Sequence, residues 1–265
     1  MNIVTVVQAR CSSTRLPNKI LLPLAGETLL FRQLERISYS KLKGKIIVAT
    51  STDNSDDIIE KICDEKNFTC FRGSLLDLLD RHYQAAKLFN PDAVVKIPSD
   101  CPLIDSEIID KVIGFFIQNS SDYDFVSNLH PPSYPDGNDV EIMHFNVLEE
   151  AWKNAKRQLE REHTTPYIWE NPDKFRIGNV VWETGLNYSM THRFTIDYPE
   201  DYEFIKKVYD ELFPKNPKFG LYDILNLLEE KPELKKINEK YNGVNWYRNH
   251  LNDLKTISAD QTKII

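Results

Sequence analysis

The first half of the chain alternates short apolar runs with segments in which apolar residues recur at helical spacing. Residues 3–7 are β-branched and mostly apolar, which is typical of a strand buried on both faces of a parallel sheet. The same reasoning predicts strands at 46–49, 68–71 and 92–97, and helices at 28–37, 53–66, 75–89 and 104–117. This order predicts an α/β fold with a Rossmann-like, doubly wound, mostly parallel sheet.

The pattern changes after about residue 122. The turn-rich stretch HPPSYPDGN separates two predicted strands, and the segments that follow are predicted as helices at 147–156 and 160–169, strands at 174–182 and 193–196, and helices at 199–213 and 221–229. The strand at 193–196 is expected to return to the sheet. We therefore expect a single domain over residues 1–230, with a smaller β-rich insertion at 130–183, followed by a C-terminal extension at 231–265.

Composition narrows the range of partners. The 265-residue chain carries 33 Lys and Arg against 40 Asp and Glu, a formal net charge of −7, so we expect neither a nucleic-acid nor a membrane partner. The sequence has no secretory signal pattern and no long apolar run, which favours a cytoplasmic location. Its four cysteines lack C-x-x-C spacing and are expected to be free thiols. An anionic ligand therefore needs a local group of cations.

Such a group follows the first predicted strand. Arg10, Arg15 and Lys19 lie in the stretch VVQARCSSTRLPNKIL, at a position where loop amides and a helix N-terminus also favour phosphate. The chain has neither a G-x-x-x-x-G-K-S/T loop nor a G-x-G-x-x-G fingerprint, which argues against a P-loop NTPase and a dinucleotide-dependent oxidoreductase. On the residues alone, the alternative is a solvated loop whose charges promote solubility.

Two aspartates follow predicted strands. Asp100 lies in the segment IPSDCPLI, and Asp197 lies in RFTIDYPED. Ligands of doubly wound sheets lie beyond the carboxyl ends of the strands, which is where both residues are expected. Each aspartate also suits the N-cap of the helix that follows it, so the residues alone leave a ligand-binding role and a capping role open.

These segments resemble motifs of a known enzyme family. The signature loop of the cytidylyltransferases that activate acidic sugars is matched by Ala9-Arg10-x-x-Ser13-Thr14-Arg15-Leu16-Pro17-x-Lys19, although several members carry Gly where this chain has Asn18. D-x-P-L at Asp100 and I-D-x-P-E-D at Asp197 match two further motifs. Over residues 1–213 the chain is similar to the spore coat polysaccharide biosynthesis group, which is related to 3-deoxy-manno-octulosonate and acylneuraminate cytidylyltransferases. The resemblance implies a fold of the nucleotide-diphospho-sugar transferase type.

The resemblance also implies roles for individual residues. Nucleotide binding is assigned to Ala9, Arg10, Ser13, Arg15, Lys19, Gly73, Arg81 and Asp100. Catalysis is assigned to Arg10, Arg15, Lys19, Asp100 and Asp197. Of these, Asp100 and Asp197 are expected to hold Mg²⁺, the one cofactor that the resemblance implies.

The segments PDGNDVE and EREHTTPY resemble stretches of the spore coat group that line the acceptor side. The resemblance makes Asp139, Glu141, Arg161 and His163 candidates to bind or deprotonate an acceptor hydroxyl, with His163 the natural titrating group. The alternative is an ordinary turn followed by a helix of mixed charge.

The predicted function is a CTP-dependent cytidylyltransferase. It transfers CMP to an acidic sugar or a phosphorylated small molecule, releases pyrophosphate, and serves surface polysaccharide or glycan biosynthesis. A homodimer is expected, with part of 130–183 at the interface. The alternatives are a sugar-1-phosphate nucleotidyltransferase that uses another nucleoside triphosphate, a non-catalytic nucleotide-binding regulator, and a metal-dependent glycosyltransferase, for which Asp122-Tyr123-Asp124 supplies a D-x-D motif.

Overall fold

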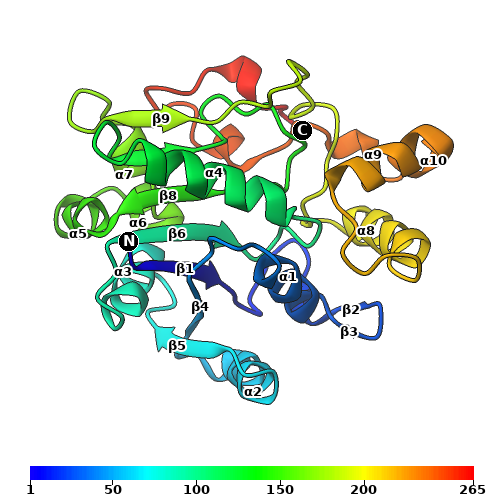
Figure 1. Cartoon of the computed structure of the whole chain (residues 1–265), viewed down its shortest axis with the longest axis horizontal. Helices are drawn as coiled ribbons and strands as arrows, with labels where there is room; N and C mark the ends of the chain where they lie inside the picture. Colours follow the sequence, from blue (N-terminus) through cyan, green and yellow to red (C-terminus); the bar gives the residue numbers. More distant parts are fainter.

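A seven-stranded sheet forms the centre of the molecule in the computed structural model, which describes residues 1–265 (Figure 1). Its strands are β1 (Ile3–Gln8), β4 (Lys45–Ser51), β5 (Thr69–Gly73), β6 (Ala93–Pro98), β7 (Phe125–Ser127), β8 (Glu141–His144) and β9 (Ile177–Asn179). They lie in the order β5-β4-β1-β6-β8-β7-β9, and only β8 runs antiparallel to its neighbours. The predicted doubly wound, mostly parallel α/β sheet is therefore confirmed.

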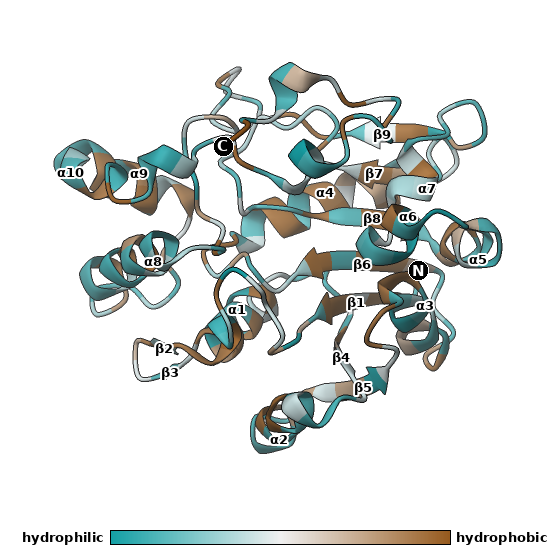
Figure 2. Ribbon diagram, turned by 180° about the vertical axis from the view of Figure 1, so that it is seen from behind, coloured by the Kyte–Doolittle hydropathy of each residue, from teal (hydrophilic) through white to brown (hydrophobic).

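Helices cover both faces of the sheet. One face carries α1 (Leu29–Ser38), α2 (Asp57–Glu65), α4 (Ser106–Gln118), α8 (Pro199–Leu212) and α9 (Leu221–Glu230). The other carries α3 (Leu78–Lys87), α5 (Phe145–Asn154), α6 (Gln158–His163) and α7 (Pro166–Trp169). Figure 1 shows α1 and α4 in front of the sheet, and Figure 2 shows α3 and α6 in front when it is seen from behind.

Strand β1 shows why its apolar run predicted a buried strand. Ile3 and Val7 pack into the core on the α1 side, whereas Val4 and Val6 pack into the core on the α3 side. Successive side chains of a strand point to opposite faces, so burial on both faces requires apolar residues at nearly every position. The hydrophobic colouring of β1 and β6 in Figure 2 reflects this requirement.

Two predictions for the second half need correction. The strand at 193–196 is wrong, because the backbone N–H groups of Phe194 and Ile196 bond to Asp136 and Asp100, which belong to two different loops. The segment 130–183 is richer in helix than the expected β-rich insertion, since it contains α5, α6 and α7. Its strands β8 and β9 belong to the main sheet.

The C-terminal extension folds back onto the α3 side of the sheet. After α10 (Pro232–Lys235), the chain forms three short 3₁₀ turns, and Tyr247 and Leu254 enter the core on that side. Glu170 accepts hydrogen bonds from the backbone N–H groups of Lys255 and Thr256 at 2.6 and 2.8 Å. None of the helices has the length and apolar content of a membrane span.

Candidate active site

A cavity of about 490 Å³ lies beyond the carboxyl ends of β1 and β6, where the fold predicts a ligand. Its lining comes from segments far apart in the sequence: the loop after β1, the loop before α3, the loop after β6, and residues 128–141, 162–169, 189–197 and 243–247. The cavity has two halves, which we name after the ligands that the sequence resemblance implies. The loops after β1 and before α3, with the start of α3, line the nucleotide half, and residues 128–141, 162–169 and 243–247 line the acceptor half. Residues of the loop after β6 and of 189–197 lie between the halves.

The loop after β1 turns sharply at Asn18. Its φ of 56° and ψ of 23° place Asn18 in the left-handed region, which glycine adopts freely and asparagine more readily than most other residues. The turn directs Lys19 inward, where its Nζ donates to the Ile196 carbonyl at 2.6 Å.

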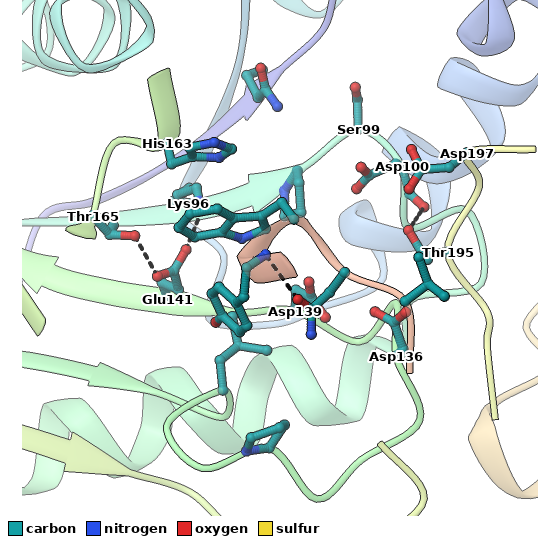
Figure 3. Close-up of a pocket in the computed structure, with 18 of the residues that line it drawn as sticks. Lys96, Ser99, Asp100, Asp136, Asp139, Glu141, His163, Thr165, Thr195 and Asp197 are labelled. Carbon is teal, nitrogen blue, oxygen red and sulfur yellow. Dashed lines mark hydrogen bonds and ion pairs between the residues drawn. The ribbon is translucent and has the colours of Figure 1, made fainter. Parts of the chain in front are cut away.

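The structure brings Asp100 and Asp197 together around one cation. Lys19 Nζ lies 3.0 Å from Asp197 Oδ1 and 3.7 Å from Asp100 Oδ2. The two loops are joined directly, because the Ile196 N–H and the Thr195 hydroxyl both donate to the Asp100 carbonyl at 2.9 Å. Figure 3 shows the two carboxylates side by side at one end of the site.

Neither aspartate caps a helix through its side chain. The N-cap of α4 is Asp105, which accepts from the Glu107 N–H at 2.7 Å. At the start of α8, Asp201 accepts from the N–H groups of Asp197 and Tyr198 at 2.9 and 3.0 Å. The capping alternative is therefore wrong for both residues, and both carboxylates face the cavity.

Three cations surround the Asp197 carboxylate. Arg15 approaches at 2.6 Å, Lys19 at 3.0 Å and Arg193 at 3.2 Å. Burial raises the pKa of Asp197, but the charges of Lys19, Arg15 and Arg193 outweigh it, so the pKa lies below its ordinary value. Arg193 is itself 2% exposed and also pairs with Asp201 at 2.9 Å. No sequence motif predicted a role for Arg193 in the site. The sequence shows only that it lies four residues before Asp197.

Arg10 and Arg81 are the cations of the nucleotide half without a carboxylate partner. Arg10 lines the cavity and is exposed. Arg81 is 1% exposed, its Nη1 donates to the Ser74 carbonyl at 2.7 Å, and its Nε has no partner. Burial, followed by the nearby charge of Arg10, lowers the pKa of Arg81 to about 10. A buried guanidinium with an unused donor favours an anionic or acceptor-rich ligand.

Ala9 and Gly73 lie behind this half of the cavity, and neither lines it. The Ala9 N–H bonds to the Ala49 carbonyl at 3.1 Å and continues the pairing of β1 with β4. A Cβ at Gly73 would lie 2.8 Å from the Phe71 ring and 3.2 Å from Arg81 Cγ. Gly73 therefore leaves room for Arg81, whereas Ser13 lines the cavity itself, as its predicted role requires.

Arg161 does not line the cavity, contrary to the expected acceptor role. Its Nε donates to Asp77 Oδ2 at 2.9 Å, and its Nη1 donates to the Trp152 carbonyl at 2.7 Å. Asp77 is the N-cap of α3, so Arg161 connects α6 to the start of α3. The apolar spacing of 160–169 predicted one continuous helix. The structure has two, since the chain turns at Thr164, whose φ is 71°, between the end of α6 and the start of α7 at Pro166.

The acceptor half contains the other three predicted residues, Asp139, Glu141 and His163 (Figure 3). Glu141 on β8 forms an ion pair with Lys96 on β6, and the Thr165 hydroxyl donates to Glu141 Oε1 at 2.7 Å. Lys96 was not singled out in the sequence. The sequence carries one signal for it, because a lysine interrupts the apolar run AVVKIP. In the structure, this lysine side chain is 15% exposed.

Two titratable groups of the acceptor half, Asp139 and His163, have opposite pKa shifts. Burial, assisted by the charge of Asp100, raises the pKa of Asp139 to about 7. Burial lowers the pKa of His163 to about 3, and its ring stacks on Trp246 with centroids 3.8 Å apart. His163 is therefore neutral at physiological pH, and the titrating role expected for it suits Asp139 better.

The D-x-D motif of the glycosyltransferase alternative lies away from the cavity. Asp124 pairs with Arg176 at 2.6 Å, and neither Asp122 nor Asp124 lines the cavity. The motif therefore has a structural role at the start of β7.

Known proteins resemble the chain over most of its length. A family model described as "Cytidylyltransferase" matches residues 4–233. The spore coat polysaccharide biosynthesis protein SpsF of Bacillus subtilis is 31% identical over 237 residues, which cover 88% of this chain and 96% of that protein. A solved cytidylyltransferase structure from Leptospira borgpetersenii superposes with a TM-score of 0.83 at 35% identity and covers 88% of this chain and 96% of its own.

A second group of relatives matches a shorter part. The 3-deoxy-manno-octulosonate cytidylyltransferase of Chloroherpeton thalassium is 36% identical over 121 residues, which cover 46% of this chain and 48% of that protein.

Proposed function

Because the chain belongs to the cytidylyltransferase family, we propose that it transfers CMP from CTP to an acidic sugar or a phosphorylated small molecule and releases pyrophosphate. The observation that carries this proposal is the convergence of a cationic loop and two carboxylates at the carboxyl end of the sheet. Phosphoryl and nucleotidyl transfer demand positioning and charge stabilisation more than covalent chemistry, and this arrangement supplies both.

The nucleotide half would bind CTP. Arg10, Arg15, Lys19 and Ser13 are the proposed triphosphate contacts, supported by the backbone at Ala9. Arg15 and Lys19 share one oxygen of Asp197, so both side chains already point to the place where phosphate oxygens would compete for them. The unpaired Arg81, with Gly73 behind it, is the proposed contact at the other side of the nucleotide.

Asp100 and Asp197 fit a Mg²⁺ ion by the chemistry of their donors. Mg²⁺ takes one or two carboxylates together with phosphate oxygens, and these two carboxylates converge on a single ammonium group. When bound, the ion would neutralise charge on the reacting phosphate.

The chain's own residues then account for the remaining steps. An acceptor oxygen attacks the α-phosphorus in line, a new P–O bond forms, and the bond to pyrophosphate breaks. Arg15 and Lys19 would stabilise the charge on the leaving pyrophosphate. Asp139, which lines the acceptor half and has a pKa near neutrality, would accept the proton of an acceptor hydroxyl.

The relative SpsF is named as a spore coat polysaccharide biosynthesis protein. We propose that this chain serves a related pathway of surface polysaccharide or glycan biosynthesis. We also propose a cytoplasmic homodimer with part of 130–183 at its interface, which sedimentation at micromolar concentration would test.

Pyrophosphate release tests the proposed function. CTP, UTP, ATP and GTP are compared with Mg²⁺ and with 3-deoxy-manno-octulosonate, N-acetylneuraminate, sugar 1-phosphates and glycerol 3-phosphate as acceptors. We expect acceptor-dependent release with CTP alone. Release with another nucleotide would overturn the base assignment, and intact CTP binding with no release on the whole panel would favour the regulator.

A further inference from the structure

The C-terminal extension supplies part of the acceptor half. Residues 243–247 line the cavity, although the family match ends at residue 233. In Figure 3 this segment, in the reddish colour of Figure 1, runs past Asp136 and Asp139. Neither the family model nor the signature motifs assign these residues a role.

The segment is held firmly where it meets the cavity. The Val244 carbonyl accepts from the buried Arg193 at 2.8 Å, and the Gly243 carbonyl accepts from the Lys263 N–H at 2.7 Å. Gly243 has a φ of 74°, and a Cβ there would lie 2.5 Å from Met190. These contacts fix the backbone that presents Trp246 and Tyr247 to the cavity.

Trp246 combines a fixed ring with a free donor. Its ring stacks on His163 with centroids 3.8 Å apart and planes 11° apart, and the residue is partly exposed at the cavity. The chain has four tryptophans, and the Nε1–H groups of the other three donate to protein oxygens, namely those of Asp80, Thr165 and Tyr222. The Trp246 Nε1–H has no such partner.

Tyr247 provides a second, independent observation. It lines the cavity and is only 8% exposed, and its ring packs edge-on against Trp169 with centroids 6.2 Å apart. Its hydroxyl has no hydrogen-bond partner in the protein and is not among the fully buried atoms that lack one, so it remains accessible to a ligand in the cavity. Burial, followed by the charges of Glu141 and Asp139, raises the pKa of Tyr247 well above its ordinary value, so the hydroxyl stays protonated and can donate.

We infer that Trp246 and Tyr247 determine acceptor specificity and that the acceptor is a sugar ring rather than a small, non-cyclic phosphorylated molecule. This inference rests on the proposed function. A sugar ring has apolar C–H groups that pack against an aromatic ring, and hydroxyls that accept from an indole N–H or a phenol. Asp139, which also lines this half, is an acceptor for hydroxyl donors of the same ring.

Steady-state kinetics of Trp246→Ala, Trp246→Phe and Tyr247→Phe test this inference, with 3-deoxy-manno-octulosonate and glycerol 3-phosphate as probes. We expect the KM for the sugar acid to rise about ten-fold in Trp246→Ala and about three-fold in Tyr247→Phe. The KM for CTP should stay unchanged, and Trp246→Phe should recover part of the loss. Trp152→Phe is the matched control for Trp246→Phe, because Trp152 is a tryptophan that does not line the cavity, and its acceptor KM should equal that of wild type.

Unchanged acceptor KM values in folded variants would overturn the inference, as would an equal rise in the KM for CTP or better turnover of glycerol 3-phosphate than of the sugar. If Trp246→Ala has a strongly lowered Tm, the conservative Tyr247→Phe decides. A wild-type protein that releases no pyrophosphate from CTP with any acceptor of the whole panel refutes the proposed function and the inference together. An active wild type with unaltered variants refutes the inference alone.

Discussion

The two halves of the cavity are built differently. The nucleotide half carries the cations Arg10, Arg15, Lys19 and Arg81, and three of them come from one loop after β1. The acceptor half combines carboxylates with aromatic rings and takes them from β8, from the segment around α6, and from the C-terminal extension. Charge therefore divides the cavity into a part suited to a triphosphate and a part suited to hydroxyl groups.

The difference shows how the fold makes each part. In a parallel sheet, the carboxyl ends of neighbouring strands meet at one edge, so short loops suffice to assemble the nucleotide half. The acceptor half depends instead on packing between segments more than 80 residues apart. An example is His163 of α6, which stacks on the ring of Trp246 in the C-terminal extension, beyond the residues that the family model matches. We therefore expect nucleotide binding to depend on single loop residues, and acceptor binding on several distant segments.

The largest effect is expected for the nucleotide half. Lys19→Gln removes the ammonium group between the two aspartates and should lower kcat/KM for CTP by about 10²–10³. Lys111→Gln, which removes an exposed ion pair with Glu183, is the control and should leave the rate unchanged. Full activity of Lys19→Gln would contradict a role of the cationic loop in the mechanism.

Asp139→Asn tests the acceptor half and should lower kcat by about 10². Because the pKa of Asp139 is raised to about 7, the carboxylate is ionised above pH 7 and protonated below it. The wild-type rate should therefore fall as the pH drops through 7, and Asp139→Asn should lack this limb of the pH–rate profile. If the same limb persists in the variant, another group is the proton acceptor.

Arg161 separates structural from catalytic roles. Arg161→Ala removes the ion pair between α6 and the start of α3, and should lower the free energy of unfolding by about 1–2 kcal/mol. Its kcat and acceptor KM should stay within about two-fold of wild type, as urea unfolding and kinetics will show. A selective rise in acceptor KM would restore the role that the sequence resemblance implied.

The smallest effect concerns two histidines of the acceptor half. Burial lowers the pKa of His130 to about 4 and that of His163 to about 3, whereas unfolded histidine titrates near 6.5. Below pH 6.5 the unfolded chain binds more protons at these histidines than the folded chain does. The free energy of unfolding is therefore highest above pH 6.5 and decreases as the pH falls toward 4. Urea unfolding at pH 7.5 and 5.5 should show that His130→Gln reduces this loss, by about 1 kcal/mol. An unchanged pH dependence would contradict a neutral His130 in the folded protein.

The features that could be predicted from sequence are local or repeat along the chain. Apolar periodicity gave the strands and helices of the first half, and strand ends gave Asp100, Asp197 and the loop cations. Lys96 was overlooked because its partner Glu141 lies on a strand 45 residues away, and nothing in the strand pattern pairs the two.

The segments that were misjudged depend on tertiary contacts. Residues 193–196 have the composition of a strand, but their backbone hydrogen-bond partners lie in two loops. The ion pairs of the buried Arg193 with Asp136 and Asp201 hold the segment in this position. Arg161 has the sequence context of an acceptor ligand, yet Asp77 binds it outside the cavity. Long-range charge pairing of this kind leaves no periodic signal in the sequence.

Detection of the product by ³¹P NMR tests the central claim most directly. Wild-type protein, CTP, Mg²⁺ and the preferred acceptor are combined, and the same mixture is prepared with Asp100→Ala and with Asp124→Ala, an aspartate outside the cavity. We expect equal amounts of a CMP-linked phosphodiester and pyrophosphate with wild type and Asp124→Ala, and neither product with Asp100→Ala. Formation of CDP and phosphate, or full activity of Asp100→Ala, would contradict the assignment of this cavity as a cytidylyltransferase site.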